Sequence, residues 1–570
     1  MKFSFTHIFL FALIGLLALA GCKAPTIEEK AEVIISGGPI YTVNPENPEV
    51  EAVAIKNGKI LFAGSKSVAD SIYTDESTGY LNLEGKTLTP GLIESHGHFM
   101  GLGYSKLNVD LNGLTSYQEL IDILGQVAKQ TAPGEWIVGR GWHQSKWKDD
   151  KSGWFRGFPV HTALSEVTPN NPVYLKHASG HACLANAKAM EIAGVTASTE
   201  FPSDGEIIKD FNGKPTGIFN ELAQGLISKH IPESTPERDR KALEMAIKES
   251  IEHGLTSFQD AGSGNSDIAL FQEFLEEGKL KLNLWVMLHG RDTTLLNEWY
   301  EKGPTIDPEG RLTIRAIKLY ADGALGSRGA WLLDPYTDRP NHVGMATMPM
   351  DFIYKITQGG MANGFQVCTH AIGDRANREV LDQYERVFNE FPQKSEDHRF
   401  RIEHAQHIHP EDIPRFGEMD VIASMQAIHM SSDRPWAINR LGKMRIEQGA
   451  YVWKKLFQSG AKIINGTDTP VEPVSPIASF YASVTRQTLA GEPIGGFEPE
   501  QKMTRFEALK SYTLDAAYGA FEEKIKGSIE VGKRADFTIF SQDILQVPDS
   551  ILLQTEIEMT IVGGEMVYKR

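Results

Sequence analysis

The segment TPGLIESHGHF, residues 89–99, carries two histidines and a glutamate that could act together. If the segment is a β-strand, alternate residues project from one face, so Glu94, His96 and His98 share that face. Imidazole is a common metal ligand, but histidines also pack, titrate and donate hydrogen bonds in many other settings. The pair by itself therefore leaves metal binding and ordinary packing open.

A lysine in the segment RAIKLYADG, residues 315–323, is a second group that needs a chemical explanation. Ile317 and Leu319 share the face that suits packing against helices, so Lys318 points to the opposite side, into the fold. A buried ammonium group is costly unless it is paired or loses its charge. We therefore expect another group to engage Lys318.

Two further segments place metal-ligand types at the ends of predicted strands. Alternation in GFQVCTHAIGD, residues 364–374, points Cys368 and His370 inward, and in AKIINGTDTP it places Asp468 at the strand end. Cys368 lies one layer below His370 without an assigned base, so we interpret it as a packed side chain. Imidazoles and carboxylates that converge at one point are the ligand set of zinc or a similar divalent ion.

The segment RFRIEHAQHI, residues 399–408, does not follow the same rule. Alternation puts His404 on one face with Phe400 and Ile402, so Arg401 and Glu403 would face the helices. A bulge or a shorter strand would allow His404 to join the other strand ends. Both interpretations of this strand remain open at the level of sequence.

The middle of the chain alternates apolar strands with helical segments, and this pattern predicts parallel strand pairing. Eight such strands predict a (β/α)₈ barrel, with an open doubly wound sheet as the alternative. The predicted strands are LIESHGHF, GLTSFQDAG, KLNLWVMLHG, RAIKLYADG, GFQVCTHAIGD, RFRIEHAQHI, DVIASMQAIHM and AKIINGTDTP.

The remaining segments predict two additions to the barrel of residues 89–524. Residues 30–88 and 525–570 are rich in strand patterns and Gly-Gly turns, which favours one small β-sandwich built from both chain ends. The interval between the first two barrel strands is far longer than one βα unit, so an inserted subdomain is expected at about residues 105–250.

Composition indicates a globular protein that acts on small molecules. The 570 residues are 41% hydrophobic, enough for a large core, and the formal net charge is -17. Without a basic stripe to neutralise phosphates, nucleic-acid binding is not expected. A small-molecule substrate is the expected partner, and association into a homodimer is left open.

The first residues, MKFSFTHIFLFALIGLLALAGCKAP, are typical of an export signal. The apolar run is short for a bilayer span, although an uncleaved anchor is the alternative. Residues 19–22, LAGC, resemble a bacterial lipoprotein cleavage box, so we expect a signal peptide at residues 1–21 and a lipid on Cys22. The mature protein would be exported and tethered to a membrane, at its periplasmic or outer-membrane face. Cys183 and Cys368 would remain, without a disulfide framework.

Six motifs in order resemble the amidohydrolase superfamily, and specifically its amidohydrolase family 3 domain, the branch of the N-substituted formamide deformylases. They are PGLIESHGHF, KLYADGALGSRGA, THAIGDRAN, RIEHAQ, NGTDTPVEP and GSIEVGKRADFTIF. Two positions depart from the usual family pattern: Glu94 stands where aspartate is more common, and GWHQ replaces GWDQ at His143.

The resemblance implies a site for one or two divalent ions, Zn²⁺ being the expected metal. His96, His98 and Asp468 would hold the first ion, and His370 and His404 the second. Lys318 would be carboxylated on its amine and bridge the ions as a carbamate, which would account for a lysine inside the barrel.

The resemblance implies hydrolysis of non-peptide C–N bonds in amides, formamides or cyclic amides by metal-activated water. Asp468 would take the proton of the water and return it to the leaving amine. The alternatives are ester, lactone or phosphoester hydrolysis at the same site, or a solute-binding lipoprotein without catalysis.

Several other residues are weaker candidates, each with an ordinary structural role as the alternative, which for Arg328 is an ion pair. Glu94 lies one layer beneath His96, so we interpret it as a group that orients a ligand. The candidates for contact with substrate are His429 at the end of a barrel strand, Arg328, and Trp142, His143, His177 and His181 of the insert.

Overall fold

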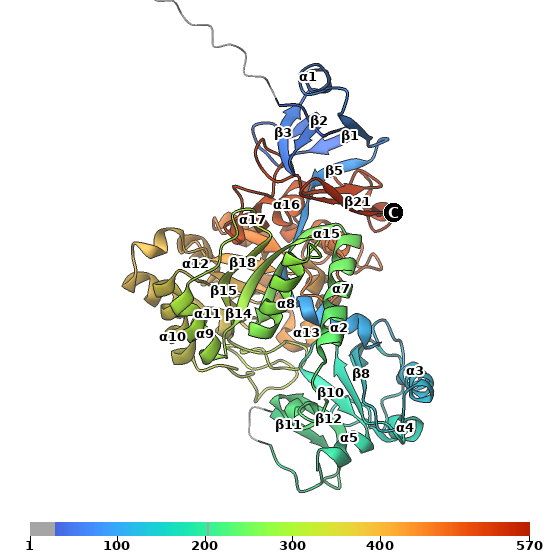
Figure 1. Cartoon of the computed structure of the whole chain (residues 1–570). Coiled ribbons are helices and arrows are strands. Elements are labelled where there is room, and N and C mark those ends of the chain that lie inside the picture. The colour runs from blue at the N-terminus through green and yellow to red at the C-terminus, as the bar shows by residue number, and fades with distance from the viewer. Residues whose placement is uncertain (1–28, 202–204) are drawn as a thin grey trace, which may run out of the picture.

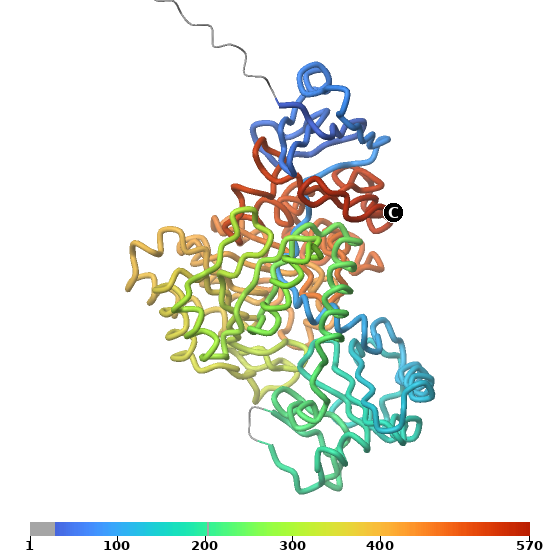
Figure 2. Tube along the Cα trace, viewed as in Figure 1, coloured from blue at the N-terminus to red at the C-terminus, as the bar shows by residue number. Residues whose placement is uncertain are grey.

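The computed structural model describes residues 29–201 and 205–570, and three bodies follow one another in Figure 1. A sheet containing both chain ends lies at the top, a barrel in the middle and a second sheet at the bottom; Figure 2 shows the same path as a tube. The expected signal peptide and Cys22 lie outside the described residues. Within the described residues, no helix is long and apolar enough to cross a membrane.

Eight parallel strands form the central sheet and follow chain order. A doubly wound sheet would reverse its order at one point, so this sheet is the predicted barrel. The ends of the sheet meet where Asp468 N donates to His96 O at 2.8 Å and His98 N donates to Thr469 O at 2.7 Å. The ring is thereby nearly closed. Its strands are β6 (Leu92–Gly97), β13 (Leu255–Ser263), β14 (Asn283–His289), β15 (Leu312–Tyr320), β16 (Gln366–Ala371), β17 (Arg401–His404), β18 (Ile422–Met425) and β19 (Ile463–Asn465).

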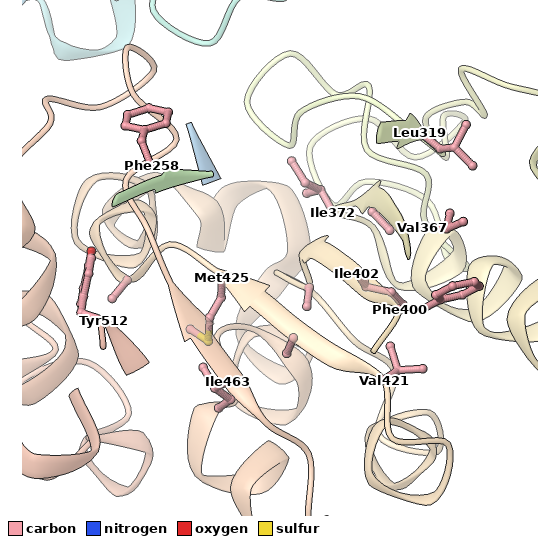
Figure 3. Packing of buried hydrophobic residues seen from close by; sticks show 14 of the residues in the cluster. Phe258, Leu319, Val367, Ile372, Phe400, Ile402, Val421, Met425, Ile463 and Tyr512 are labelled. Carbon is pink, nitrogen blue, oxygen red and sulfur yellow. The ribbon is translucent and has the colours of Figure 1, made fainter. Parts of the chain in front are cut away.

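An apolar layer joins the outer face of the barrel to its helices. Leu319, Val367 and Ile402 belong to this layer (Figure 3), as alternation along their strands requires. The helices are α2 (Phe99–Leu107), α7 (Pro236–Glu252), α8 (Asn265–Glu276), α9 (Thr293–Lys302), α10 (Met350–Asn363), α11 (Asp374–Glu390), α12 (Ile413–Glu418), α13 (Ala427–Gly449), α14 (Trp453–Gln458), α15 (Pro476–Thr485), α16 (Arg505–Ser511) and α17 (Leu514–Gly519).

The inside of the barrel holds a separate small cluster that includes Trp285, Met287, Ala316 and Cys368. Ala316 belongs to this inner cluster and Ile317 to the outer layer, so β15 has the faces predicted for it. Cys368 is fully buried among these side chains. The interior of the barrel is therefore packed with side chains.

The two faces of β17 were predicted from the sequence the wrong way round. Phe400 and Ile402 lie in the outer apolar layer, and Arg401 and Glu403 point into the barrel. His404 does not continue the outward face, because its φ of +74° takes the chain out of the extended conformation. The shorter strand is the correct alternative, and the turn at its end brings the His404 side chain to the mouth.

Both chain ends contribute to one further sheet of eight strands. The joint between the two ends is the antiparallel pairing of β5 with β20, in which Leu88 lies opposite Ile539. Division of this sheet into two layers of a sandwich stays a prediction. The strands are β1 (Val33–Tyr41), β2 (Glu49–Lys56), β3 (Lys59–Gly64), β4 (Gly79–Asn82), β5 (Thr87–Pro90), β20 (Phe537–Phe540), β21 (Ile557–Val562) and β22 (Glu565–Lys569), with helices α1 (Lys66–Ile72) and α18 (Asp549–Leu552).

The chain between α2 and α7 forms a third sheet, of six strands, which Figure 1 shows below the barrel. It has its own apolar core around Trp142, Leu175 and Ile218. We call this part the insert sheet. Its strands are β7 (Val109–Asp110), β8 (Ile137–Trp142), β9 (Val173–His177), β10 (Ala182–Ala185), β11 (Gly205–Lys209) and β12 (Pro215–Glu221), and its helices are α3 (Tyr117–Gln130), α4 (Thr162–Val167), α5 (Ala187–Ile192) and α6 (Gly225–Ser228).

The closure of the barrel predicts that Gly466 accepts no side chain. A Cβ at this position would lie 2.2 Å from Glu94 Oε1 and 2.8 Å from His96 N. Gly466→Ala should destabilise the fold by about 1–3 kcal/mol, the usual range for overpacking, and lower the midpoint of thermal unfolding. Gly225→Ala is the control, because a Cβ there meets nothing within 4 Å. Equal midpoints for the two variants would contradict the close packing described here.

Candidate metal centre

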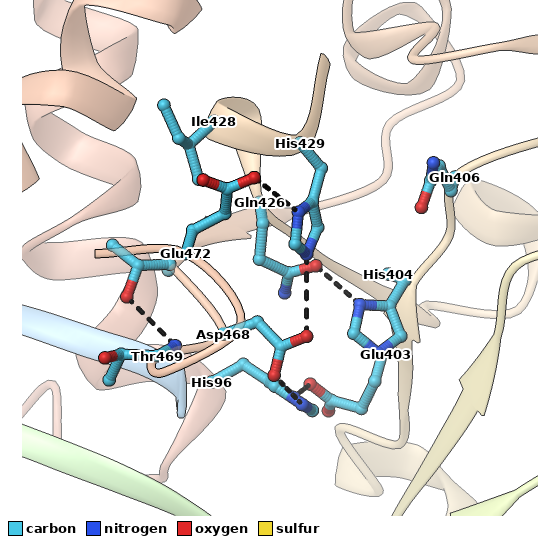
Figure 4. Close-up of polar contacts among 12 residues, drawn as sticks. His96, Glu403, His404, Gln406, Gln426, Ile428, His429, Asp468, Thr469 and Glu472 are labelled. Atoms are coloured by element: carbon cyan, nitrogen blue, oxygen red, sulfur yellow. Dashed lines mark hydrogen bonds and ion pairs between the residues drawn. The ribbon is translucent and has the colours of Figure 1, made fainter. Parts of the chain in front are cut away.

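The barrel mouth brings together every residue that the sequence nominates as a metal ligand. His98 Nε2 lies 3.2 Å and His96 Nε2 3.7 Å from Asp468 Oδ1. Lys318 Nζ lies 2.9 Å from His96 Nε2. The His404 ring is 4.9 Å from that of His96 and 4.4 Å from that of His370, measured between centroids. Five different strands therefore supply one compact group, part of which is drawn in Figure 4.

The ring of His96 is held in one tautomer by a carboxylate. Glu403 accepts a short hydrogen bond from His96 Nδ1, so the lone pair of this ring lies on Nε2. Burial opposes the charge of Glu403, but Arg401 and His96 outweigh burial and lower its pKa, so Glu403 stays ionised. Burial and the nearby Lys318 lower the pKa of His96 to about 4. A neutral imidazole with its lone pair on Nε2 is the form that binds a metal ion.

The ring of His404 is likewise held in one tautomer, here by the side-chain amide of Gln426. Its Nδ1 donates to Gln426 Oε1 at 2.6 Å, and Gln426 Nε2 donates to Ser424 O at 3.3 Å, which sets the orientation of the amide. Burial and the neighbouring His370 hold the pKa of His404 well below its usual value. Its Nε2 is thus a second neutral nitrogen donor.

Two buried atoms of this group have no hydrogen-bond partner among the described residues. They are Asp468 Oδ1 and His370 Nε2, although His98 Nε2 lies 3.2 Å from the former and Asp322 Oδ1 lies 3.4 Å from the latter. Such atoms are costly to bury unless something binds them. Together with the two prepared imidazoles they form a nitrogen and oxygen donor set that fits a divalent cation. His96, His404 and Asp468 have ligand atoms within 4.8 Å of one another.

Lys318 is a buried amine whose near neighbours include no ion-pair partner. Its exposed fraction is 1%, and burial lowers its pKa. In the described part of the chain, no carboxylate forms an ion pair with its Nζ within 4.0 Å, and its hydrogen bond goes to His96. The expectation that another group engages this lysine therefore stays a prediction.

His429 lies beside the carboxylate of Asp468. Its Nε2 is 3.5 Å from Asp468 Oδ2, and its Nδ1 is 4.0 Å from Glu472 Oε1 (Figure 4). Burial opposes its charge, but the two carboxylates outweigh burial and raise the pKa of His429 to about 10. Burial also opposes ionisation of Asp468, yet His429 and His98 hold its pKa well below the usual value. Asp468 is therefore a carboxylate.

A cavity of about 320 Å³ opens onto this group, a volume that suits a small molecule. His143, His177, His181 and His429 line it, as the sequence predicts for contact with substrate. Its apolar lining includes Phe158, Leu325, Ile372 and Trp436.

Two of the nominated substrate residues do not reach the cavity. Trp142 is fully buried in the core of the insert sheet, where its Nε1 donates to Leu175 O at 2.8 Å. Arg328 forms a two-bonded ion pair with Asp338, at 3.1 and 2.9 Å. Their side chains are satisfied elsewhere, and the cavity lining does not include them.

From the sequence Glu94 is expected to orient a ligand, but in the structure Glu94 binds backbone and Glu403 orients the His96 ring. Glu94 Oε1 accepts from Thr467 N at 2.7 Å and from His96 N at 3.1 Å, so Glu94 holds backbone and not the ring. The ring is held by Glu403, which sequence reasoning placed outside the barrel. The position of Glu403 directly before the candidate ligand His404 could have indicated this role, because metal-binding histidines usually donate to a carboxylate or carbonyl.

A parallel barrel with neutral imidazoles and a carboxylate at its mouth is the kind of site that metal-dependent hydrolases use. The chain belongs to the amidohydrolase family, whose sequence pattern matches residues 80–568. It is 32% identical over 549 residues to Protein LONG AFTER FAR-RED 3 of Arabidopsis thaliana, covering 94% of this chain and 92% of that protein. It is 27% identical to the N-substituted formamide deformylase of Arthrobacter pascens, covering 95% and 98% of the two chains.

A solved structure agrees with this membership. The crystal structure of an uncharacterized metal-dependent hydrolase from Pyrococcus furiosus superposes with a TM-score of 0.71 at 29% identity. The similarity covers 90% of this chain and all of that one.

The contact between Glu403 and His96 predicts a loss of bound metal when the carboxylate is removed. Glu403→Gln should weaken metal affinity about 10- to 100-fold, the usual effect of losing such a partner, and reduce the metal content of purified protein. It should also lower the unfolding midpoint, because Arg401 keeps its buried charge without a counterion. Elemental analysis at graded chelator concentrations measures the affinity. Glu418→Gln, on an exposed side chain of α12, is the control; equal metal retention in both variants would contradict the assignment.

Proposed function

We propose that this protein hydrolyses non-peptide C–N bonds of small amides, formamides or cyclic amides. The observation that carries the proposal is the convergence of neutral imidazole Nε2 atoms and ionised Asp468 beside a cavity of small-molecule size. The similarity to a formamide deformylase along nearly the whole chain favours C–N bonds over other substrates.

We propose His96, His98 and Asp468 as ligands of one divalent ion and His370 and His404 as ligands of a second, with Zn²⁺ as the expected metal. Lys318 carboxylated at Nζ would join both groups through its carbamate oxygens. The burial of its amine, which lowers the pKa of Lys318, supports this modification, because a neutral amine is the form that reacts with CO₂. Divalent ions at this site would supply Lewis acidity and favour ionisation of water.

The protein groups around the substrate have separate tasks in this proposal. The carboxylate of Asp468 accepts the proton of the attacking water and then gives it to the leaving nitrogen. His429, held by Glu472, lies against Oδ2 of Asp468 and leaves Oδ1 directed at the ligand group. The apolar lining around Leu325 and Trp436 limits the water that can reach the reaction.

We also propose that the protein is exported and held at a membrane surface by a lipid on Cys22. The small residues that precede this cysteine, LAGC, support the proposal. Labelling with a radioactive fatty acid, followed by the Cys22→Ser variant, tests it directly.

The role of Asp468 predicts a selective loss of turnover. Asp468→Asn removes the base, so kcat should fall by a factor of about 10²–10⁴ on whichever substrate the metal-loaded protein hydrolyses. The panel to test contains N-formyl amines, N-acyl amines, cyclic imides, lactones and phosphoesters. Activity should also disappear with a chelator and return with Zn²⁺.

The matched control is Asp420→Asn, since both aspartates have positive φ, +58° at Asp468 and +53° at Asp420, a conformation that asparagine tolerates. Asp420 is exposed, follows α12 in the chain and does not line the cavity. Full activity of Asp468→Asn would refute its role as the base. Hydrolysis confined to lactones or phosphoesters would refute the C–N specificity and retain the metal site.

A further inference from the structure

The cavity has a second polar wall, which comes from the insert sheet. His143, His177 and His181 all line it, together with metal-centre residues of the barrel. No step of the proposed reaction uses these three rings. Their hydrogen bonds show which ring nitrogen each could offer to a substrate.

The three rings differ in what holds them. His177 has both nitrogens engaged, Nδ1 with Ser179 Oγ and Nε2 with Gln144 Oε1, each at 2.9 Å. His143 Nδ1 is buried and has no partner among the described residues. His181 Nδ1 lies 2.8 Å from Glu221 Oε2, and its side chain is 24% exposed. Nε2, at the opposite edge of the His181 ring, is thus available to the cavity.

Glu221 is itself held firmly where the insert sheet meets the barrel. Its backbone N donates to His181 O at 2.8 Å, and its φ is +49°, an unusual conformation for a glutamate. Its second oxygen, Oε1, accepts from Ser327 Oγ at 3.2 Å. A Cβ on Gly329 would lie only 3.0 Å from the same oxygen, so the glycine permits this approach. Ser327 and Gly329 lie in the loop that follows β15, the strand of Lys318.

The pair also has the charges that a hydrogen-bond donor needs. Burial opposes the charged form of His181, but Glu221 outweighs burial and raises its pKa. Burial likewise opposes ionisation of Glu221, and His181 outweighs it and lowers that pKa. The contact of Nδ1 with a carboxylate at 2.8 Å favours the imidazolium, in which the second N–H is on Nε2, at the opposite edge of a ring that lines the cavity.

We propose that His181 is a catalytic residue whose Nε2–H donates a hydrogen bond to the carbonyl oxygen of the scissile amide, and that Glu221 is its positioning residue. This inference rests on the proposed hydrolysis. When water oxygen bonds to the carbonyl carbon, the π electron pair of the C=O bond moves onto oxygen, and the donor stabilises that growing charge. No proton is transferred at His181. A donor fixed in advance by a carboxylate avoids reorganisation during the reaction.

The experiment compares His181→Gln and Glu221→Gln with wild type in the full-length, metal-loaded protein. The substrate is the amide of the panel that wild type hydrolyses fastest. Loss of an oxyanion donor should lower kcat by about 10²–10³ in His181→Gln and change KM much less. Glu221→Gln should show a smaller fall, and Glu221→Asp, which keeps the carboxylate, should recover part of it. Metal content and unfolding midpoint should stay at wild-type values in His181→Gln.

The control is His253→Gln, whose ring bonds only its own helix through Glu249 O at 2.8 Å and does not line the cavity. Wild-type kcat in His181→Gln would overturn the inference and leave the proposed function standing. A fall in kcat that follows a loss of metal would overturn it too, because His181 would then act on the metal site. Wild-type protein that hydrolyses no amide would overturn both proposals.

Discussion

The buried charge of Arg401 is the constraint on which the centre of this protein depends. Arg401 has no exposed surface, and it is held by Glu403 at 2.7 Å, Gln259 Oε1 at 2.6 Å and Ser95 O at 2.6 Å. An arginine removed from water must have such partners, since breaking a buried pair leaves an uncompensated charge. Its bonds join β6, β13 and β17 inside the barrel. Glu403, fixed by this cation, then fixes the ring of His96.

The closure of the barrel applies a second constraint to the same residues. The last strand ends at Asn465, and the chain then returns to β6 through backbone bonds of Asp468 and Thr469. Glu94 binds the backbone on both sides of this joint. The distance from Asp468 to the two histidines of β6 is therefore set by the same contacts that complete the ring. Stability and ligand geometry depend on one set of hydrogen bonds.

Alternation and order were enough to predict much of this arrangement. The parallel barrel, the inward Lys318 and the meeting of strand ends follow from the two-residue period of a strand and from the closure of a parallel sheet. The two-residue period holds along β17, but the two faces were assigned the wrong way round, because an arginine and a glutamate occupy the interior positions and an apolar residue lies outside. Charge normally marks the solvent side, and only their pairing shows that these two are inside. Such pairing depends on which side chains meet in the folded structure, and no periodic pattern in the sequence reveals it.

The same limit applies to aiming the ligands. His404 and Asp468 both have positive φ, at +74° and +58°, so each side chain leaves the direction that its strand would give it. Non-glycine residues in this region are costly and persist where surrounding contacts hold them. Here the bonds to Gln426 and from His429 provide that support, and the same bonds fix the free nitrogen of one residue and the charge of the other. The strand ends depart from regular geometry at the ligands themselves. Extending regular strands therefore locates the mouth of the barrel but does not identify the hydrogen-bond partners that orient each ligand.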